Sequence, residues 1–367
     1  MGIYLFLIAV LAVCGYIEIS GKYERAAKYT EWISFALFLF VGVFRETTVG
    51  NDALSYDTDY FSVANRWKWG SLLTDFSKDN GFMLLTKIIR VYTDDYWGYR
   101  AILFTLTLTL YFCAIRENSN YVSVSLFIFA GLSNLGLMLG ILRQALAGAI
   151  CFFSYGFLKR EKEIPYALLV LLAATMHKTA LICLLYLPLR WFVKKRFSPL
   201  IFVFGIWMSL LVGYSILPVA VKLYANGGYV NSMITDGGEK LFLAINVLIG
   251  SVMFFASDTV WHKGKFGNLL TPAKADEKYF YDTEHAFQFN VASSSVFVQT
   301  IAMVFWGLLT RMRTYLSIYW VLLLPEAIEK LPQKRKILFF IGLILAFGVM
   351  IYFSLNDVDY FVLHKFA

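Results

Sequence analysis

Long apolar runs, separated by short stretches that carry lysine and arginine, recur along the whole chain. About 20 apolar residues span the hydrocarbon core of a bilayer as one helix, and such a segment satisfies its backbone hydrogen bonds internally. With 59% hydrophobic and 16% charged residues over 367 positions, the chain is much less charged than a soluble domain. The pattern predicts an all-α polytopic membrane protein with about ten to twelve transmembrane helices.

A single integral membrane domain over residues 1–367 accounts for these runs, because no interval between them has room for a soluble domain. Residues 2–19 lack a basic start and a convincing cleavage site, so we expect a retained helix rather than a signal peptide. The polar intervals predict outer loops over residues 45–80 and 220–240 and an inner loop over 257–288.

The net charge of +8 reports membrane orientation rather than a nucleic-acid partner, because the basic residues cluster between apolar runs. Lys22, Arg25 and Lys28 follow the first run, and basic loops between membrane helices stay in the cytoplasm. The segment that begins at Arg45, after the next run, is therefore expected outside. We expect the lipid bilayer, and no nucleic acid, among the partners.

Two apolar runs do not fit one ordinary transmembrane helix. Residues 164–193 are too long, and splitting them at His177 returns the basic cluster that follows to the cytoplasm. Residues 81–92 are too short to span and carry charges, which favours a re-entrant or partly inserted helix. Broken helices at a membrane site usually line a binding site, so the sequence predicts broken or re-entrant helices near the outer face. Residues 121–139 and 315–328 are each expected to cross the membrane.

No metal or cofactor is expected. The four cysteines lie within apolar runs without a CxxC motif and are typical of small buried hydrophobic residues. The DxD tripeptide at residues 57–59 has a metal-binding form used with nucleotide sugars, but it falls outside, where such donors are absent. No P-loop, dinucleotide-binding glycine motif, HExxH or serine elbow is present in the sequence.

Two arginine motifs point to phosphate. Arg45 stands at a helix exit and is followed by Gly50, Asp52 and Tyr56, which supply a turn, a carboxylate and a phenol. Arg143, with Gln144 after it, precedes small residues that let another helix approach closely. The planar guanidinium matches phosphate oxygens with two hydrogen bonds. The structural alternatives are a headgroup anchor for Arg45 and a helix-pairing ion pair for Arg143.

His177, next to Lys178, is the one histidine within an apolar run, and imidazole can accept a proton from a sugar hydroxyl near neutral pH. A lone buried histidine is also often structural. Arg311 and Arg313 lie two positions apart, so both reach one ligand only at a loop or helix end. Their presence on the outer side favours an anionic partner, and interfacial snorkelling is the alternative.

These motifs resemble those of the EpsG family of bacterial exopolysaccharide proteins, a branch of the Wzy-type polysaccharide polymerases. The resemblance rests on short motifs in the family's order that together cover most of the chain: Phe44–Arg45 with Gly50, Asn51, Asp52 and Tyr56; Asn80, Gly81 and Phe82; residues 142–147; residues 176–181; and residues 311–315. One departure is visible, because an acid is expected directly before Gly81, where this chain has Asp79 and Asn80.

The resemblance implies a glycosyltransferase in the bacterial cytoplasmic membrane with its active site facing outside. It would join oligosaccharide repeat units carried on undecaprenyl pyrophosphate during exopolysaccharide, capsule or O-antigen synthesis, without a metal. A flippase and a chain-length regulator are expected partners. Arginines would stabilise the pyrophosphate leaving group, and a base would activate the acceptor hydroxyl.

The expected roles follow from this chemistry. Arg143 with Arg311 or Arg313 would clamp the donor pyrophosphate, and His177 or Asp52 would be the base. The acceptor would be bound by Arg45, Tyr56, Gln144 and Lys178. The alternatives are a lipid-linked oligosaccharide flippase, which usually has two related halves that are not detectable here, and a membrane O-acetyltransferase or ligase that acts on the same polysaccharide.

Overall fold

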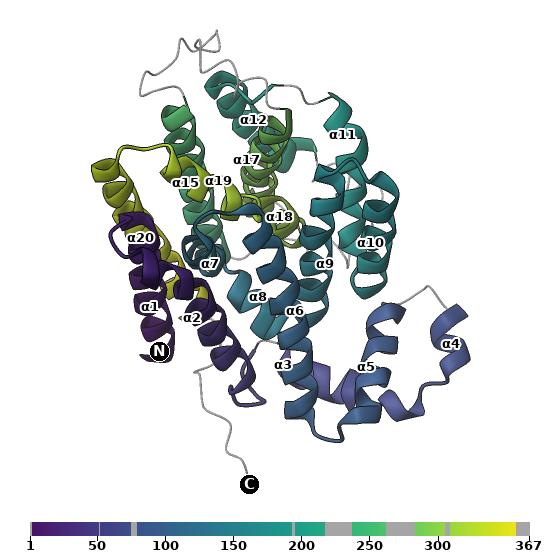
Figure 1. Ribbon diagram of the computed structural model, residues 1–367. Coiled ribbons are helices and arrows are strands. Elements are labelled where there is room, and N and C mark those ends of the chain that lie inside the picture. The colour runs from purple at the N-terminus through teal and green to yellow at the C-terminus, as the bar shows by residue number, and fades with distance from the viewer. Residues whose placement is uncertain are drawn as a thin grey trace. The chain divides into compact units, whose positions relative to one another are not determined.

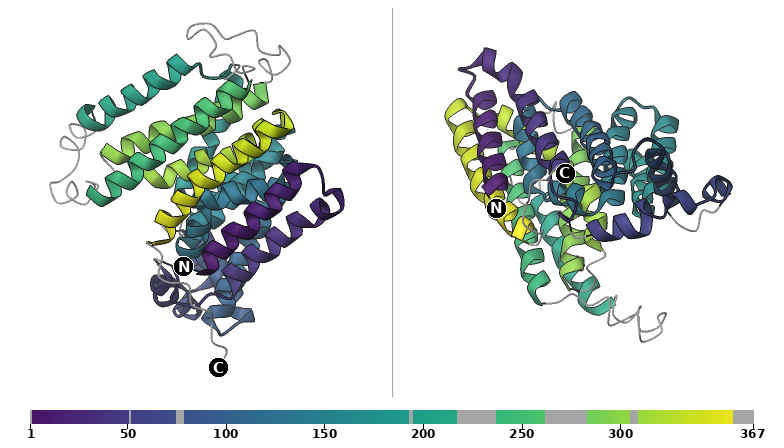
Figure 2. Two further views of the ribbon diagram at one scale, coloured as in Figure 1. Left: turned by 90° about the vertical axis from the view of Figure 1, so that its left-hand side faces the viewer. Right: turned by 90° about the horizontal axis from the view of Figure 1, so that it is seen from below.

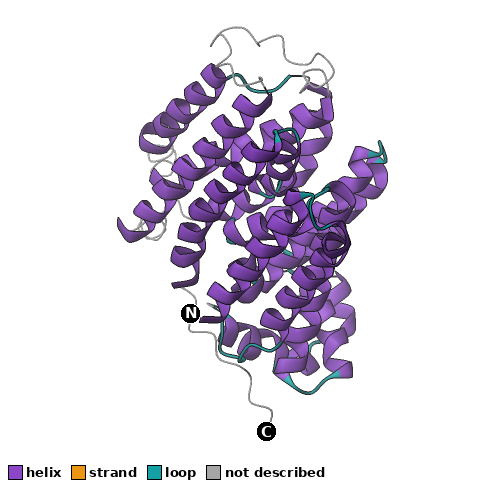
Figure 3. Ribbon diagram, turned by 60° about the vertical axis from the view of Figure 1, so that its left-hand side comes forward, coloured by secondary structure: helices purple, strands orange, loops and turns teal. Residues whose placement is uncertain are grey.

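The computed structural model describes residues 2–50, 52–74, 79–192, 195–216, 237–261, 283–304 and 309–356, and within these ranges every regular element is a helix (Figure 3). Three helical segments there are long and apolar enough to cross a membrane, and a bent pair adds a fourth. They are α2 (Glu24–Val43), α6 (Tyr96–Asn118) and Pro199–Ile216. The prediction of an all-α polytopic membrane protein is confirmed.

The chain divides into two compact units. The first comprises Met1–Leu184 and Pro332–Ala367, and the second comprises Leu185–Leu331. The predicted loops at 220–240 and 257–288 fall mostly outside the described residues, so their placement and the single integral domain stay predictions.

In the first unit, the last described helix packs against the first. α20 (Gln333–Asn356) lies beside α1 (Gly2–Ser20) and also contacts α7 (Val122–Gly131) (Figure 2). The side-chain amide of Gln333 donates to the carbonyl oxygens of the last two residues of α1, at 2.8 and 3.0 Å. The carboxylate of Glu18 accepts a hydrogen bond from the backbone N–H of Ser123 at 3.0 Å and so caps the start of α7.

Three adjacent helices of the same unit support the site. α9 (Leu142–Lys159) packs between α6 and α10 (Glu163–Met176), and α9 and α10 are adjacent in Figure 1. The predicted close approach at the small residues is confirmed at Gly148, where an added Cβ would lie 2.6 Å from the hydroxyl oxygen of Tyr111 on α6.

The predicted break at His177 is confirmed. α10 ends at Met176, His177 is extended, and the chain continues as the 3₁₀ helix η3 (Lys178–Leu185) and then α11 (Tyr186–Phe192). The predicted span over 121–139 is present as a bent pair of helices. Ser133 adopts φ +65°, and α8 (Asn134–Gly140) leaves the line of α7 by 65°. A left-handed residue cannot continue an α-helix.

Residues 52–74 and 79–92 form a series of short helices. It contains α3 (Ala53–Tyr56), the π-helix η1 (Asp57–Phe61), η2 (Ala64–Arg66), α4 (Trp69–Thr74) and α5 (Asn80–Tyr92). The predicted short helix over 81–92 is therefore present as α5.

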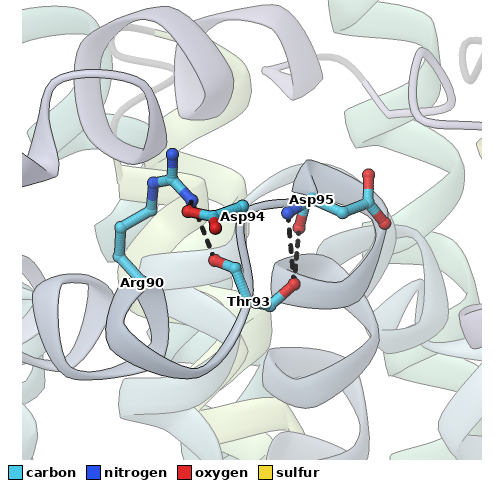
Figure 4. A network of polar contacts seen from close by, with 4 residues as sticks. All are labelled: Arg90, Thr93, Asp94 and Asp95. Carbon is cyan, nitrogen blue, oxygen red and sulfur yellow. Dashed lines mark hydrogen bonds and ion pairs between the residues drawn. The ribbon is translucent and has the colours of Figure 1, made fainter.

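A polar network fixes the turn from α5 to α6 (Figure 4). Arg90 forms an ion pair with Asp94 and donates to the carbonyl oxygen of Thr93 at 3.0 Å. The hydroxyl of Thr93 accepts from the backbone N–H of Asp95 at 3.2 Å, and the Asp95 carboxylate accepts from the N–H of Gly98 at 3.0 Å, which caps α6. The network sets the direction of α5, whose other end carries the site.

The second unit is built around α17 (Thr283–Val304), which packs against α12 (Pro199–Leu211), α15 (Gly237–Trp261) and α18 (Leu309–Ser317). The η4 turn (Val212–Ile216) extends α12. Phe202 and Phe254 stack with ring centroids 3.8 Å apart. The predicted span over 315–328 is interrupted, because α18 ends at Ser317 and α19 (Trp320–Glu329) begins after two turn residues.

Candidate functional site

The loop after α2 is fixed against the end of α8 by Gly50 and Arg45. Gly50 adopts φ +123°, and a Cβ there would lie 2.3 Å from the carbonyl oxygen of Leu139, so the position accepts only glycine. Arg45 is 1% exposed, donates to the carbonyl oxygens of Gly42 and Leu139, and lies over the ring of Phe104 at 5.3 Å. Its guanidinium therefore holds backbone, and its predicted acceptor role stays a prediction.

A second buried arginine holds the same loop. Arg100, near the start of α6, donates to the carbonyl oxygens of Glu46 and Val49 at 2.9 and 2.5 Å. The loop carbonyls are thereby satisfied without water, and the chain that leads into α3 has a defined position.

Tyr56 connects this loop to the start of α9. It ends α3, and its buried hydroxyl oxygen accepts a hydrogen bond from the backbone N–H of Arg143 at 3.3 Å. The first N–H groups of a helix have no partner within the helix, so the phenol satisfies one of them. Burial raises the pKa of the Tyr56 phenol, so the group stays neutral over the physiological range.

Arg143 forms an ion pair with Asp79. Its Nη1 atom lies 2.6 Å from Oδ2 of the carboxylate. The Asp79 side chain is 12% exposed and that of Arg143 is 29% exposed, so the pair is mostly buried but still open to solvent on one side. Such a pair is stronger than one on a fully exposed surface.

Two tyrosines flank the guanidinium. The Cζ atom of Arg143 lies 5.1 Å from the ring centroid of Tyr60 and 6.0 Å from that of Tyr56. Tyr60 belongs to the π-helix η1 and packs edge-on against Phe82 of α5. π-helical turns are rare and frequently occur at functional sites. The rings limit the directions in which Arg143 can point.

Gly81 brings the start of α5 against the end of α10. A Cβ at Gly81 would lie 2.0 Å from Oγ1 and 2.6 Å from Cβ of Thr175, two residues before His177. This close approach places Oδ2 of Asp79 3.7 Å from Nδ1 of His177. One carboxylate oxygen therefore faces both Arg143 and His177.

The charges around Asp79 keep it ionised. Burial by itself raises the pKa of the Asp79 carboxyl, but contact with His177 and the charges of Arg143 and Lys178 outweigh it and lower the pKa below its usual value. Asp79 is thus a carboxylate at neutral pH. The charged groups of Arg143 and Lys178 thus lie around one carboxylate.

Three buried nitrogen atoms at this site have no hydrogen-bond partner within the described part of the chain. They are Nε of Arg143 and both ring nitrogens of His177. A buried polar atom without a partner costs roughly 1–3 kcal/mol, and such atoms are uncommon in native structures. Their clustering beside one ion pair is what a site for a polar ligand shows.

The remaining predicted residues of the first unit differ in how far their side chains are exposed to solvent. Gln144 is fully buried in α9, Lys178 is exposed at the start of η3, and Asp52 is half-buried directly before α3. These positions do not test the predicted acceptor roles or the choice of Asp52 as a base.

Arg311 and Arg313 belong to the second unit, on α18. Arg311 is exposed, whereas Nη1 of Arg313 donates to the side-chain oxygen of Asn246 at 3.0 Å. Both arginines therefore lie on one helix, but their side chains have different surroundings. Their predicted contact with the donor pyrophosphate stays a prediction.

Asp79 and Tyr60 were not predicted as site residues. Asp79 lies in a stretch that the sequence had marked, since an acid was expected beside Gly81, but its distance of 64 residues from Arg143 hides the ion pair. Tyr60 has no motif that distinguishes it from the other 22 tyrosines of the chain.

Comparison with known proteins gives one family. The EpsG family model matches residues 28–365, which include every residue of the site. Neither the comparison with curated proteins nor that with solved structures gives a match.

Proposed function

The chain belongs to the EpsG family, a family similar to the Wzy-type polysaccharide polymerases, and on that premise we propose that it polymerises lipid-linked repeat units. Its polymerase-like role in a membrane follows from the family and the apolar helices. The proposed donor is the growing chain on undecaprenyl pyrophosphate. The proposed acceptor is a hydroxyl at the non-reducing end of a new lipid-linked unit.

The observation that carries the proposal is the meeting of Arg143, Asp79 and His177 beside unpaired buried nitrogen atoms. In the proposed reaction the acceptor oxygen forms a bond to the anomeric carbon of the donor sugar, and the bond from that carbon to the pyrophosphate oxygen breaks. His177 takes the hydroxyl proton, and the lipid pyrophosphate leaves with its electron pair against Arg143.

The position of the site supports the outer face. Arg143 lies at the start of α9 and Lys159 at its end, roughly 24 Å away at about 1.5 Å per residue, against about 30 Å for the hydrocarbon core. Lys159 and Arg160 mark the cytoplasmic end by the positive-inside rule. His177, at the opposite end of α10 from these residues, then belongs to the outer end of the bundle.

The test is the lipid-linked glycan pool of a strain that lacks this protein. A polymerase predicts single repeat units accumulating on the outer face, with loss of polymer. Units trapped on the inner face would instead indicate a flippase, and full-length polymer without its decoration or attachment would indicate an O-acetyltransferase or ligase. Either of those results overturns the proposal. Complementation by the Arg143→Ala variant at equal protein level shows whether this site is responsible.

A further inference from the structure

Oδ2 of Asp79 occupies one hydrogen-bond donor position of the Arg143 guanidinium. It lies 2.6 Å from Nη1, the distance expected of a charge-assisted hydrogen bond. The guanidinium is also confined by the rings of Tyr56 and Tyr60. A phosphate oxygen that takes the position of Oδ2 on Nη1 displaces the carboxylate.

A short movement of Asp79 would bring the same oxygen into hydrogen-bond contact with His177. It lies 3.7 Å from Nδ1, beyond hydrogen-bond distance, and neither ring nitrogen has another partner within the part of the chain that the structure describes. Once the carboxylate has left Arg143, a movement of about 1 Å brings Oδ2 within hydrogen-bond distance of Nδ1 of His177. His177 is the extended residue that ends α10, where its backbone N–H donates to the carbonyl oxygen of Ala173 at 2.9 Å.

From this shared contact, and resting on the proposed function, we infer that Asp79 is a positioning residue that links donor binding to the readiness of His177. Without substrate, Asp79 stands in for a phosphate oxygen on Arg143. When the pyrophosphate binds Arg143, Asp79 is released and accepts a hydrogen bond from Nδ1 of His177. That bond leaves Nε2 as the proton acceptor and stabilises the imidazolium formed when the acceptor hydroxyl is deprotonated.

This role predicts opposite effects on binding and on turnover. The Asp79→Asn variant no longer has to break an ion pair, so it should bind pyrophosphate more tightly, by about threefold or more. The same variant cannot hold the imidazolium, so its kcat should fall by about 10²-fold or more. A residue that only stabilised the fold would lower both.

The experiment measures the binding of undecaprenyl pyrophosphate to the purified full-length protein in nanodiscs, and turnover with a defined lipid-linked repeat unit. Glu31→Gln is the control, because it removes one carboxylate charge from an ion pair with the exposed Arg116, outside the site. It should change neither quantity. Asp79→Glu keeps the carboxylate and should recover part of the turnover.

The possible outcomes distinguish the proposed donor site at Arg143 from the proposed role of Asp79. If Arg143→Ala leaves the affinity for undecaprenyl pyrophosphate unchanged, the proposed donor site is wrong, whatever Asp79 does. If Arg143→Ala weakens binding but Asp79→Asn binds no more tightly than the wild type, the donor site stands and the role of Asp79 is wrong. Tighter binding together with unchanged turnover would also overturn the link to His177.

Discussion

Oδ2 of Asp79 lies 2.6 Å from Nη1 of Arg143, across 64 residues of sequence. The contact joins the start of α5 to the start of α9, and the same oxygen faces His177 at the end of α10. Three separate pieces of chain thus supply one cation, one anion and one titratable ring. This convergence gives the following predictions their sites.

Arg143 should be required for donor use. Replacing it by alanine removes the only guanidinium that Asp79 contacts among the described residues, and kcat/KM with a lipid-linked repeat unit should fall by about 10²–10³-fold. Lysine keeps the charge but not the planar fork, so Arg143→Lys should be intermediate. The exposed Arg116, paired with Glu31, provides the control Arg116→Ala, which should retain activity.

His177 should affect turnover more than binding. His177→Gln keeps the approximate size of the side chain but removes the base, and kcat should fall by about 10²–10⁴-fold with little change in the affinity for undecaprenyl pyrophosphate. Single-turnover kinetics on purified protein separate the two quantities. Unchanged kcat would exclude His177 as the base and leave Asp52 as the predicted alternative.

The ion pair of Asp79 should contribute stability at neutral pH and lose it in acid. Because the pKa of the folded carboxyl is below the usual 3.8, the contribution is complete above that value and disappears as pH falls through the lowered pKa. The difference in unfolding temperature between wild type and Asp79→Asn should therefore be constant from about pH 5 to 8 and shrink below about pH 4. A difference that grew in acid would contradict the pKa direction.

Gly81→Ala should separate α5 from α10. The added Cβ would lie 2.0 Å from Oγ1 of Thr175, and overpacking of this kind costs about 1–3 kcal/mol. Activity should fall with stability, because Asp79 moves away from His177. Gly342→Ala is the matched control in α20, where a Cβ meets nothing within 4 Å and alanine should be neutral or stabilising by up to about 1 kcal/mol.

Tyr60 should act through its ring rather than its hydroxyl. Tyr60→Phe preserves the face toward Arg143 and should keep nearly full activity, whereas Tyr60→Ala frees the guanidinium to other directions. The KM for the lipid-linked donor should then rise by about three- to tenfold, which matches a partly buried cation–π contact. Equal effects of the two variants would assign the role to the hydroxyl instead.

The sequence predicted helix ends correctly where the length of an apolar run and the charges beside it determine them. The helix that breaks at His177 was predicted because its length and the basic cluster after it allow no single crossing, and α10 ends one residue earlier. The bend at Ser133 was missed, since nothing in an apolar run of that composition requires a left-handed residue. The break between α18 and α19 was also missed, since the two turn residues there, Ile318 and Tyr319, carry no turn signal in the sequence.

The site was predictable in part. Arg143 and His177 stand out because charged or titratable groups are expensive in apolar runs, and the structure brings both to one carboxylate. The carboxylate itself was not predicted, because only tertiary packing at Gly81 places α5 against α10. Arg45 shows the opposite case, since a buried arginine that binds carbonyl oxygens has the same sequence signature as one that binds a ligand.

The packing of α20 on α1 and α7 has a consequence for biogenesis. The faces of α1 and α7 that α20 covers stay open while the ribosome is still adding the intervening segments. Gly131 illustrates the closure, because Phe347 fills the space where its side chain would be. The first unit is therefore completed only once synthesis has passed α20, so an interrupted chain retains Arg143, Asp79 and His177 but presents unfinished surfaces to quality-control proteases.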